Sequence, residues 1–224
     1  MVSNSNSRLP SAPWLGELLS LRVPGLVILM ASIQLLLPPS LTLGPVWLIP
    51  VIELAGIPLW LVSRKHESES GRVWAVFALS YLSLLVAASV LNAALALATL
   101  FTKTTDPAGY LLFGGFGVLA VNVLSFGLVY WWIDGGGPKV RESGSVTTWD
   151  FQFPQQGSPV TGGDAWAPQL FDYIYTAYTN IIAFSPTDTM PLSHRAKFLF
   201  IIQSAVSLVT ILVTVSRAIN LIPD

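Results

Sequence analysis

Residues 169–222 read QLFDYIYTAYTNIIAF, then SPTDTMPLSHRAK, then FLFIIQSAVSLVTILVTVSRAINLI. The first run is half polar and short, whereas a helix that spans a bilayer needs about 20 apolar residues. The second run is a polar turn with two prolines, and the third is long and apolar. A short helix, a loop and a long membrane helix are typical of a re-entrant segment, which this stretch therefore predicts.

The composition of the whole chain is that of an integral membrane protein. Of its 224 residues, 53% are hydrophobic and 10% are charged, whereas soluble domains carry about 25% charged residues. A net charge of -1 gives no field that would recruit nucleic acid. The absence of cysteine excludes disulfides, thiolate metal sites and cysteine nucleophiles. We therefore expect an all-α, polytopic protein whose main partner is the lipid bilayer.

Apolar runs predict about five transmembrane helices plus the re-entrant helix. The first four runs are 23–38, 41–63, 73–102 and 110–133, and the fifth is the final run quoted above. The expected organisation is an N-terminal tail or interfacial segment (1–22), a four-helix membrane region (23–133), an extramembrane loop (134–168), and the re-entrant segment with the final helix (169–222). We expect Trp149, Phe151 and Phe153 to attach the loop to the membrane surface or to a neighbouring helix.

The distribution of Lys and Arg predicts the orientation, because basic residues collect on the cytoplasmic side. With five spans and an internal N-terminus, nine basic residues lie inside, and two, Lys103 and Arg217, lie outside. The re-entrant loop is then cytoplasmic. If residues 169–185 cross the membrane instead, the count becomes eight against three, which discriminates poorly between the two orientations.

The short half-polar helix carries its polar residues on one face. At helical spacing these residues are Asp172, Thr176, Thr179 and Asn180, and the residues that end the helix are Ser185, Pro186, Thr187 and Asp188. Backbone at membrane depth is tolerated only where it is buried in protein or lines water. The segment is therefore either re-entrant or, as the alternative, a short interfacial helix followed by a surface loop.

This segment resembles the pore region of two-span potassium-type channels, in which a pore helix precedes a filter reading TVGYGD. Here AFSPTD, residues 183–188, takes the filter position, Pro191 stands three residues after Asp188, and Arg195 and Lys197 precede the last apolar run. The resemblance implies a cation pore formed by a homo-oligomer, a tetramer in that family. With YWWIDGGGP and NIIAFSPTDTMPL, the chain also looks like a family of uncharacterised bacterial membrane proteins, which implies a multi-pass protein of the bacterial cytoplasmic membrane.

The filter position departs from the channel family in its backbone chemistry. In that family two glycines permit the alternating backbone handedness that lines up carbonyls around a bare ion. Here Ser185 and Thr187 take their places, with Pro186 between them. Proline has a fixed φ, and threonine is poorly suited to positive φ. We therefore expect, if ions pass, a wide hydrated ring of Asp188 and hydroxyl groups with weak cation preference.

The last helix carries a polar stripe along an otherwise Leu, Ile and Val sequence. Its members step by four, three, four and three residues, and they are Gln203, Ser207, Thr210, Thr214 and Arg217. Such a stripe either lines water or forms hydrogen bonds to another helix, as Ser, Thr and Gln do in membrane bundles. The sequence leaves both interpretations open.

Glu53 is an acid deep inside a predicted span. A carboxylate in lipid is costly and indicates a functional site by default. We expect it to be protonated, paired or bound to a cation, unless it lies at a shallow depth near a loop. Asn92 and Asn122, in the third and fourth spans, are candidate partners.

These features together predict an ion-channel-like pore that is weakly selective for cations. Two alternatives are a non-conducting structural or regulatory membrane protein and a small proton-coupled transporter that uses Glu53. We do not expect an enzyme, a metal site or a cofactor, because the sequence contains no nucleotide loop, zinc-ligand spacing or nucleophile elbow.

Overall fold

A computed structural model describes residues 13–66, 71–98, 107–158, 166–183 and 188–219 of the chain. The helices of this part are α1 (Pro13–Leu35), α2 (Leu48–His66), α3 (Gly71–Ala98), α4 (Ala108–Ile133), α5 (Pro138–Glu142), α6 (Leu170–Ala183) and α7 (His194–Ile219). Short 3-10 turns, η1 (Pro39–Leu41) and η2 (Asp134–Gly136), follow α1 and α4. Two antiparallel strands of two residues each, β1 (Phe151–Gln152) and β2 (Met190–Pro191), pair with each other. The fold is mostly helical, as predicted.

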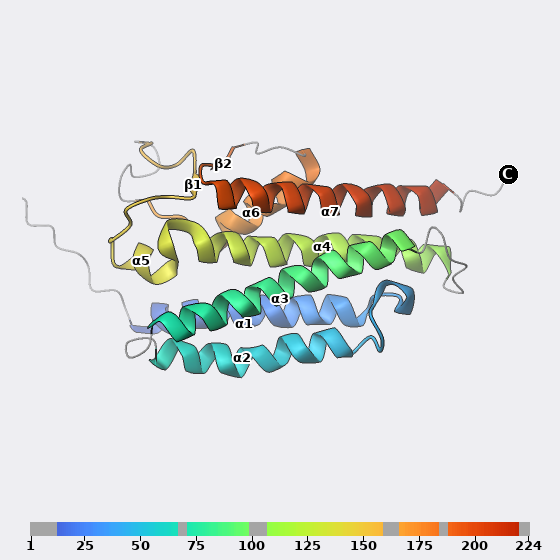
Figure 1. The fold of residues 1–224 in the computed structure, drawn as a ribbon, viewed down its shortest axis with the longest axis horizontal. Coiled ribbons are helices and arrows are strands. Elements are labelled where there is room, and N and C mark those ends of the chain that lie inside the picture. The colour runs from blue at the N-terminus through green and yellow to red at the C-terminus, as the bar shows by residue number, and fades with distance from the viewer. Residues whose placement is uncertain (1–12, 67–70, 99–106, 159–165, 184–187, 220–224) are drawn as a thin grey trace, which may run out of the picture.

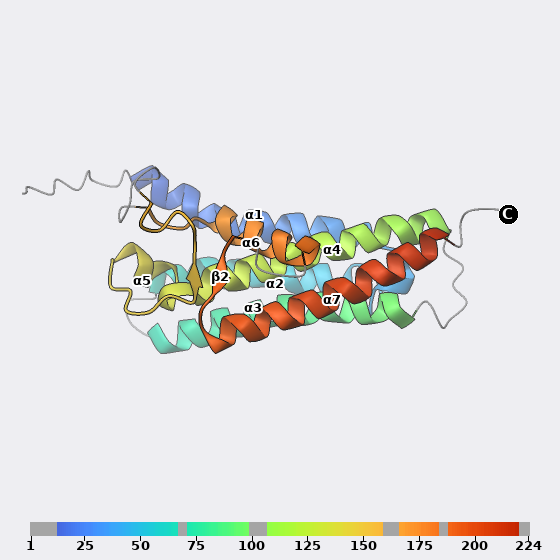
Figure 2. The same cartoon turned by 90° about the horizontal axis from the view of Figure 1, so that it is seen from above.

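Three of the helices are long and apolar enough to cross a membrane, judged by length and composition. The candidate spans are Val76–Ala98 in α3, Gly109–Gly136 in and just beyond α4, and His194–Ser216 in α7. Shorter apolar stretches occupy Arg22–Leu35 in α1 and Leu48–Val62 in α2. All five long helices lie side by side along the long axis of the molecule (Figures 1 and 2).

Two helix boundaries differ from the predicted spans. α1 begins at Pro13, so residues 13–22 are continuous with the helix of the first predicted span. Proline suits the first helical turn, where its missing N–H is not needed. α2 begins at Leu48 and not at residue 41, because a turn precedes it in which Gly44 has a φ of 71°.

α4 is the central helix, and it packs against α1, α3, α6 and α7. Its inner side chains, among them Val121, Phe126 and Leu128, are fully buried. At Gly127 the backbone of α6 comes so close that a Cβ atom would lie 3.0 Å from the Cα of Ile174.

The outer surface of the bundle is apolar, as expected for contact with lipid. On α7, for instance, Phe198 is 62% exposed.

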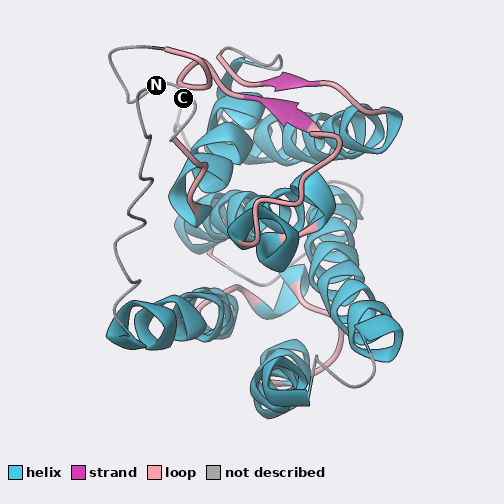
Figure 3. Cartoon of the chain, turned by 90° about the vertical axis from the view of Figure 1, so that its left-hand side faces the viewer, coloured by secondary structure: helices cyan, strands magenta, loops and turns pink. Residues whose placement is uncertain are grey.

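The α6 hairpin, which we define by its described residues 170–183 and 188–191, begins and ends at the same end of the bundle. Tyr173, near the start of α6, bonds to Asp134 at the end of α4. Asn180, near the other end of α6, bonds to Gln203 in the third turn of α7. The chain then returns to the first end, where β2 pairs with β1 and α7 begins (Figure 3).

The length of α6 fits this path. Its 14 residues extend about 21 Å at 1.5 Å per residue, while the hydrocarbon core of a bilayer is about 30 Å thick. A helix of this length reaches part of the way through the bundle and does not span it.

A labelling experiment tests the antiparallel arrangement of α3 and α4. Single cysteines can be introduced cleanly because the chain has none. Ser68→Cys, between α2 and α3, and Ser143→Cys, just after α5, should both react with a membrane-impermeant maleimide from the cytoplasmic side. The end of α2, the start of α3 and the end of α5 lie at the same end of the molecule (Figure 1), and the nine-to-two basic count gives the side.

Thr104→Cys, in the connection between the opposite ends of α3 and α4, is the matched control and should react from outside. Opposite-sided labelling of the Ser68 and Ser143 variants would contradict the helix arrangement. Labelling of both from outside would contradict the orientation.

Candidate functional site

The predicted filter position falls largely outside the described residues. Ser185, Pro186 and Thr187 are not among them, whereas Asp188 is described and exposed. The side chain of Arg217 also lies outside the described part of the chain. The roles predicted for these residues therefore remain predictions.

Two residues of the polar face of α6 form hydrogen bonds to backbone groups of this same segment. Asp172 Oδ2 accepts a hydrogen bond from the backbone N–H of Gln169 at 2.6 Å, which is the return bond of a capping box. Thr179 Oγ1 donates to the Thr176 carbonyl at 3.0 Å. Both side chains are half-buried, and their contacts explain why polar residues occur at these positions without a ligand.

Thr176 connects α6 to the returning chain. Its hydroxyl donates to the Asp172 carbonyl at 2.9 Å and lies 3.1 Å from the hydroxyl of Thr189, which directly precedes β2. Both side chains are buried. The two arms of the α6 hairpin are thus joined by a polar contact near the end where the chain enters.

A network centred on Gln203, which is 0% exposed, links the α6 hairpin to the bundle. Gln203 Oε1 accepts hydrogen bonds from the Tyr130 hydroxyl at 2.6 Å and from Asn180 Nδ2 at 2.8 Å. Gln203 Nε2 donates to the Ala177 carbonyl at 3.0 Å. Ser204 Oγ completes the network by donating to Asn180 Oδ1 at 3.2 Å. One carboxamide therefore holds α4, α6 and α7 together.

The rest of the polar stripe on α7 also faces other helices. Ser207, Thr210 and Thr214 are buried. Ser207 Oγ lies 2.8 Å from the Gln203 carbonyl and 3.4 Å from Asn122 Oδ1 of α4. Thr210 and Thr214 donate to carbonyls one turn earlier in α7. Within a single chain, this geometry matches the packing interpretation of the stripe, since its described members contact protein.

The entrance of the α6 hairpin is fixed by a buried acid that the sequence analysis did not single out. Asp134 is 0% exposed, and its Oδ1 accepts from the backbone N–H groups of Asp150 at 2.8 Å and Phe151 at 3.2 Å. Its Oδ2 accepts from the Tyr173 hydroxyl at 2.6 Å. Residues 135–137, all glycine, have φ values of 59°, 83° and 103°, which side-chain-bearing residues rarely adopt. The DGGGP motif thus turns the chain around Asp134.

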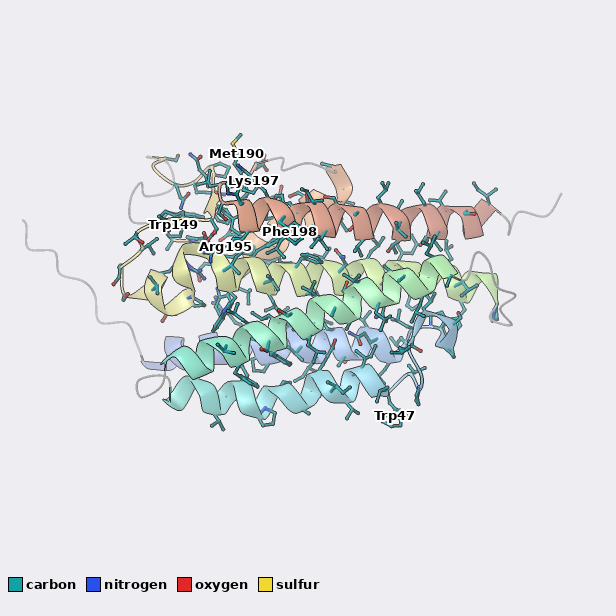
Figure 4. All side chains as sticks on the ribbon, viewed as in Figure 1. Trp47, Trp149, Met190, Arg195, Lys197 and Phe198 are labelled. Carbon is teal, nitrogen blue, oxygen red and sulfur yellow. The ribbon has the colours of Figure 1, made fainter. Side chains whose placement is uncertain are left out.

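Asp150 ties the same loop to the start of α7. Its Oδ1 accepts from Arg195 Nε at 2.6 Å, and Arg195 Nη2 also donates to the Ile133 carbonyl at 3.0 Å. Figure 4 labels Arg195 at this end of the molecule, as it does Trp149. Burial alone would raise the pKa of Asp150. Hydrogen bonds from Arg195 and Ser193, and the charge of Arg195, instead lower this pKa below its ordinary value of 3.8.

Two of the three aromatic residues predicted to attach the loop, Phe151 and Phe153, pack against neighbouring helices. Phe151 is 0% and Phe153 is 3% exposed. The ring centroid of Phe151 lies 5.2 Å from that of Tyr130 and 5.8 Å from that of Phe200. Aromatic pairs at such separations contribute beyond their buried area, so the loop is part of the packed structure.

Glu53 is fully buried, but its partners are not the predicted asparagines. Gln34 Nε2 of α1 donates to Glu53 Oε1 at 2.8 Å, and the Tyr81 hydroxyl of α3 donates to the Glu53 backbone carbonyl at 2.6 Å. Asn122 lies instead near Ser207. The signal that could have identified Gln34 is its position as a lone amide in the first apolar run. The described residues contain no cluster of three or more acidic or histidine side chains that could hold a metal ion.

The Gln203 network predicts a specific pattern of stability loss. Gln203→Leu leaves the buried donors of Tyr130 and Asn180 without an acceptor, and should lower the free energy of unfolding by about 2–4 kcal/mol. Tyr130→Phe removes one donor and leaves Gln203 paired with Asn180, so it should cost only about 1 kcal/mol. Chemical or thermal unfolding in detergent measures both. Equal losses for the two variants would contradict a central role for Gln203.

The Asp150 pair predicts an acid-sensitive contribution to stability. A carboxyl whose pKa is lowered on folding stabilises the protein above its unfolded pKa, and this stabilisation disappears as pH falls below about 4. The wild-type chain should therefore lose more stability between pH 6 and pH 3 than Asp150→Asn does, as measured by thermal unfolding. Glu142→Gln, which changes an exposed acid at the same end, should keep the wild-type pH dependence. An unchanged pH profile for Asp150→Asn would contradict this assignment.

Comparison of the chain with protein-family models, with curated proteins and with solved structures found no match. The function must therefore be argued from the arrangement of the residues themselves. The channel resemblance rests on the spacing of residues 169–222 alone.

Proposed function

We propose that this chain is an integral membrane protein with an ion-channel-like pore segment that is weakly selective for cations. The observation that carries the proposal is the path of the α6 hairpin, which packs against both α4 and α7 and returns to the end of the bundle where it began. A channel of this type has an outer helix, a re-entrant pore helix and an inner helix. In the proposal α4, α6 and α7 take these roles in chain order.

The proposal requires several copies of the chain. One chain contributes one re-entrant segment, and a pore of this type is formed by several segments around an axis. In the proposed assembly, a homo-oligomer, residues 185–188 face the axis. Asp188, which is exposed in the single chain, provides the negative charge that concentrates cations there.

The same assembly assigns a different role to the polar stripe of α7. Gln203, Ser207 and Thr210 are each 0% exposed within one chain, so they stabilise the unit and do not line its pore. The exposed face of α7 is apolar, with Ile201 and Leu212 at 66% and 60% exposure. This face would meet neighbouring copies or lipid.

The second candidate function is a non-conducting structural or regulatory membrane protein. The observation that favours it is the Gln203 network, in which both ends of the carboxamide are already satisfied by the same chain. Ser, Thr and Gln residues often serve helix packing in membranes. Flux measurements separate the two candidates.

Purified protein in liposomes should pass small cations with little preference for potassium over sodium, because the carbonyl-ladder glycines are absent from residues 185–188. Asp188→Asn should reduce the cation-over-anion permeability ratio about several-fold, since the ring of acids is removed. The matched control is Glu142→Gln, an exposed acid outside the α6 hairpin, which should leave the ratio unchanged. Reversal potentials under salt gradients give the ratio.

Two outcomes would contradict the pore proposal. Liposomes that stay tight to sodium, potassium and chloride across pH and voltage would favour the non-conducting candidate. Strong potassium selectivity would show that residues 185–188 are not the filter.

Thr210→Leu should lower stability and leave flux per folded oligomer unaltered, because Thr210 is buried inside the chain.

A further inference from the structure

A second polar cluster lies apart from the α6 hairpin, between α1, α2 and α3. Gln34 and Glu53 are 1% and 0% exposed, and the Gln34 amide nitrogen donates to Glu53 Oε1 at 2.8 Å. The other oxygen of each side chain, Gln34 Oε1 and Glu53 Oε2, has no hydrogen-bond partner in the described part of the chain. Buried polar atoms are seldom left unpaired, so two such oxygens on bonded side chains point to a missing ligand.

The surrounding helices offer no donor for these oxygens among the residues described. Tyr81 of α3 is the titratable side chain that faces Glu53, and its hydroxyl already donates to the Glu53 backbone carbonyl. The Tyr81 ring occupies the space left by Gly56, where a Cβ would lie 2.1 Å from the ring, so the hydroxyl is held in this position. α1 contributes the Gln34 amide, and the ion pair among the described residues, between Arg195 and Asp150, joins the loop to the start of α7.

We propose that Glu53 binds a proton and forms a closed acid–amide pair with Gln34. The Gln34 N–H donates to Glu53 Oε1, as in the structure, and the Glu53 Oε2–H donates to Gln34 Oε1. A single proton turns one unpaired acceptor into a donor for the other, so both oxygens are satisfied by one added atom. It also removes the charge, whose burial away from water is costly.

A metal cation fits this site less well than a proton. Calcium takes six to eight oxygen ligands and magnesium six in octahedral geometry, whereas the site offers two free oxygens, Gln34 Oε1 and Glu53 Oε2. The Glu53 backbone carbonyl accepts a hydrogen bond from the Tyr81 hydroxyl. The described residues provide no group of three acids or histidines around it.

The bound proton gives stability a defined dependence on pH. An unfolded glutamate releases its proton above about pH 4.3, while the folded pair keeps it. The folded state then binds more protons than the unfolded state, so stability falls as pH rises. The folding equilibrium constant drops about tenfold per pH unit until Glu53 itself ionises.

The test uses the full chain in lipid nanodiscs, with infrared spectroscopy of carboxyl groups at pH 7 and thermal unfolding between pH 5 and pH 9. The wild-type protein should show a protonated-carboxyl C=O band that Glu53→Gln lacks. Glu53→Gln should still fold, because an amide–amide pair makes the same two hydrogen bonds, and its unfolding temperature should lose the Glu53-dependent decline with pH. The double variant Gln34→Glu with Glu53→Gln should restore the band, since it rebuilds the pair with the roles exchanged.

Gln34→Leu provides the complementary variant, because it leaves the Glu53 carboxyl without its partner and should lower the unfolding temperature. Absence of a Glu53-dependent C=O band at pH 7 would overturn the proposal. So would an unfolding temperature that rises when sodium, potassium or calcium replaces a large organic cation in the wild type but not in Glu53→Gln, since that result identifies a metal-cation site. Failure of the exchanged double variant to recover the band would also count against a paired proton.

Discussion

The length of α6 constrains the whole C-terminal half of the molecule. A helix of 14 residues is too short to cross the hydrocarbon core of a bilayer, and lipid cannot satisfy the backbone groups at its end. The chain must therefore turn back, and α6 must be held in place by polar contacts within the protein. Two anchors meet this requirement. Asp134 holds the entrance through Tyr173 and β1, and Gln203 holds the deep end through Asn180 and Ala177.

The chemistry of the two anchors follows their depth. Charged groups gather at the end of the bundle, where Asp150 pairs with the exposed side chain of Arg195. Deeper along α7, the Gln203 network consists of neutral amides and hydroxyls. This order agrees with the much higher cost of burying a charge than a hydrogen-bonded neutral group. Glu53 is the exception among the described residues, and a bound proton removes the exception by making it neutral as well.

Features that depend on local pattern could be predicted from the sequence. The change from a half-polar run to a long apolar run predicts a short helix followed by a long one, and the helical spacing of the polar residues predicts the polar stripe of α7. The elements opposite that stripe could not be predicted, because a period identifies a face without identifying its neighbour. The link between Asp134 and Tyr173 joins residues 39 positions apart, and no local signal encodes such a pairing. Asp172 was assigned from its spacing to the polar face of α6, and that spacing does not indicate that its carboxylate caps the start of the helix.

The buried stripe changes how conduction would have to work in the proposed pore. The α7 residues that are free to face a neighbouring copy are apolar, among them Phe198, Ile201 and Leu208. A wall of this kind gives ions no polar groups to replace their water shell, and narrow hydrophobic passages close by losing water. Ions would then cross hydrated or not at all. Cation preference would depend on Asp188 at the hairpin, which acts through its field and not through direct coordination. In the proposed pore, weak selectivity would thus follow from the packing of α7 as well as from the residues at the filter position.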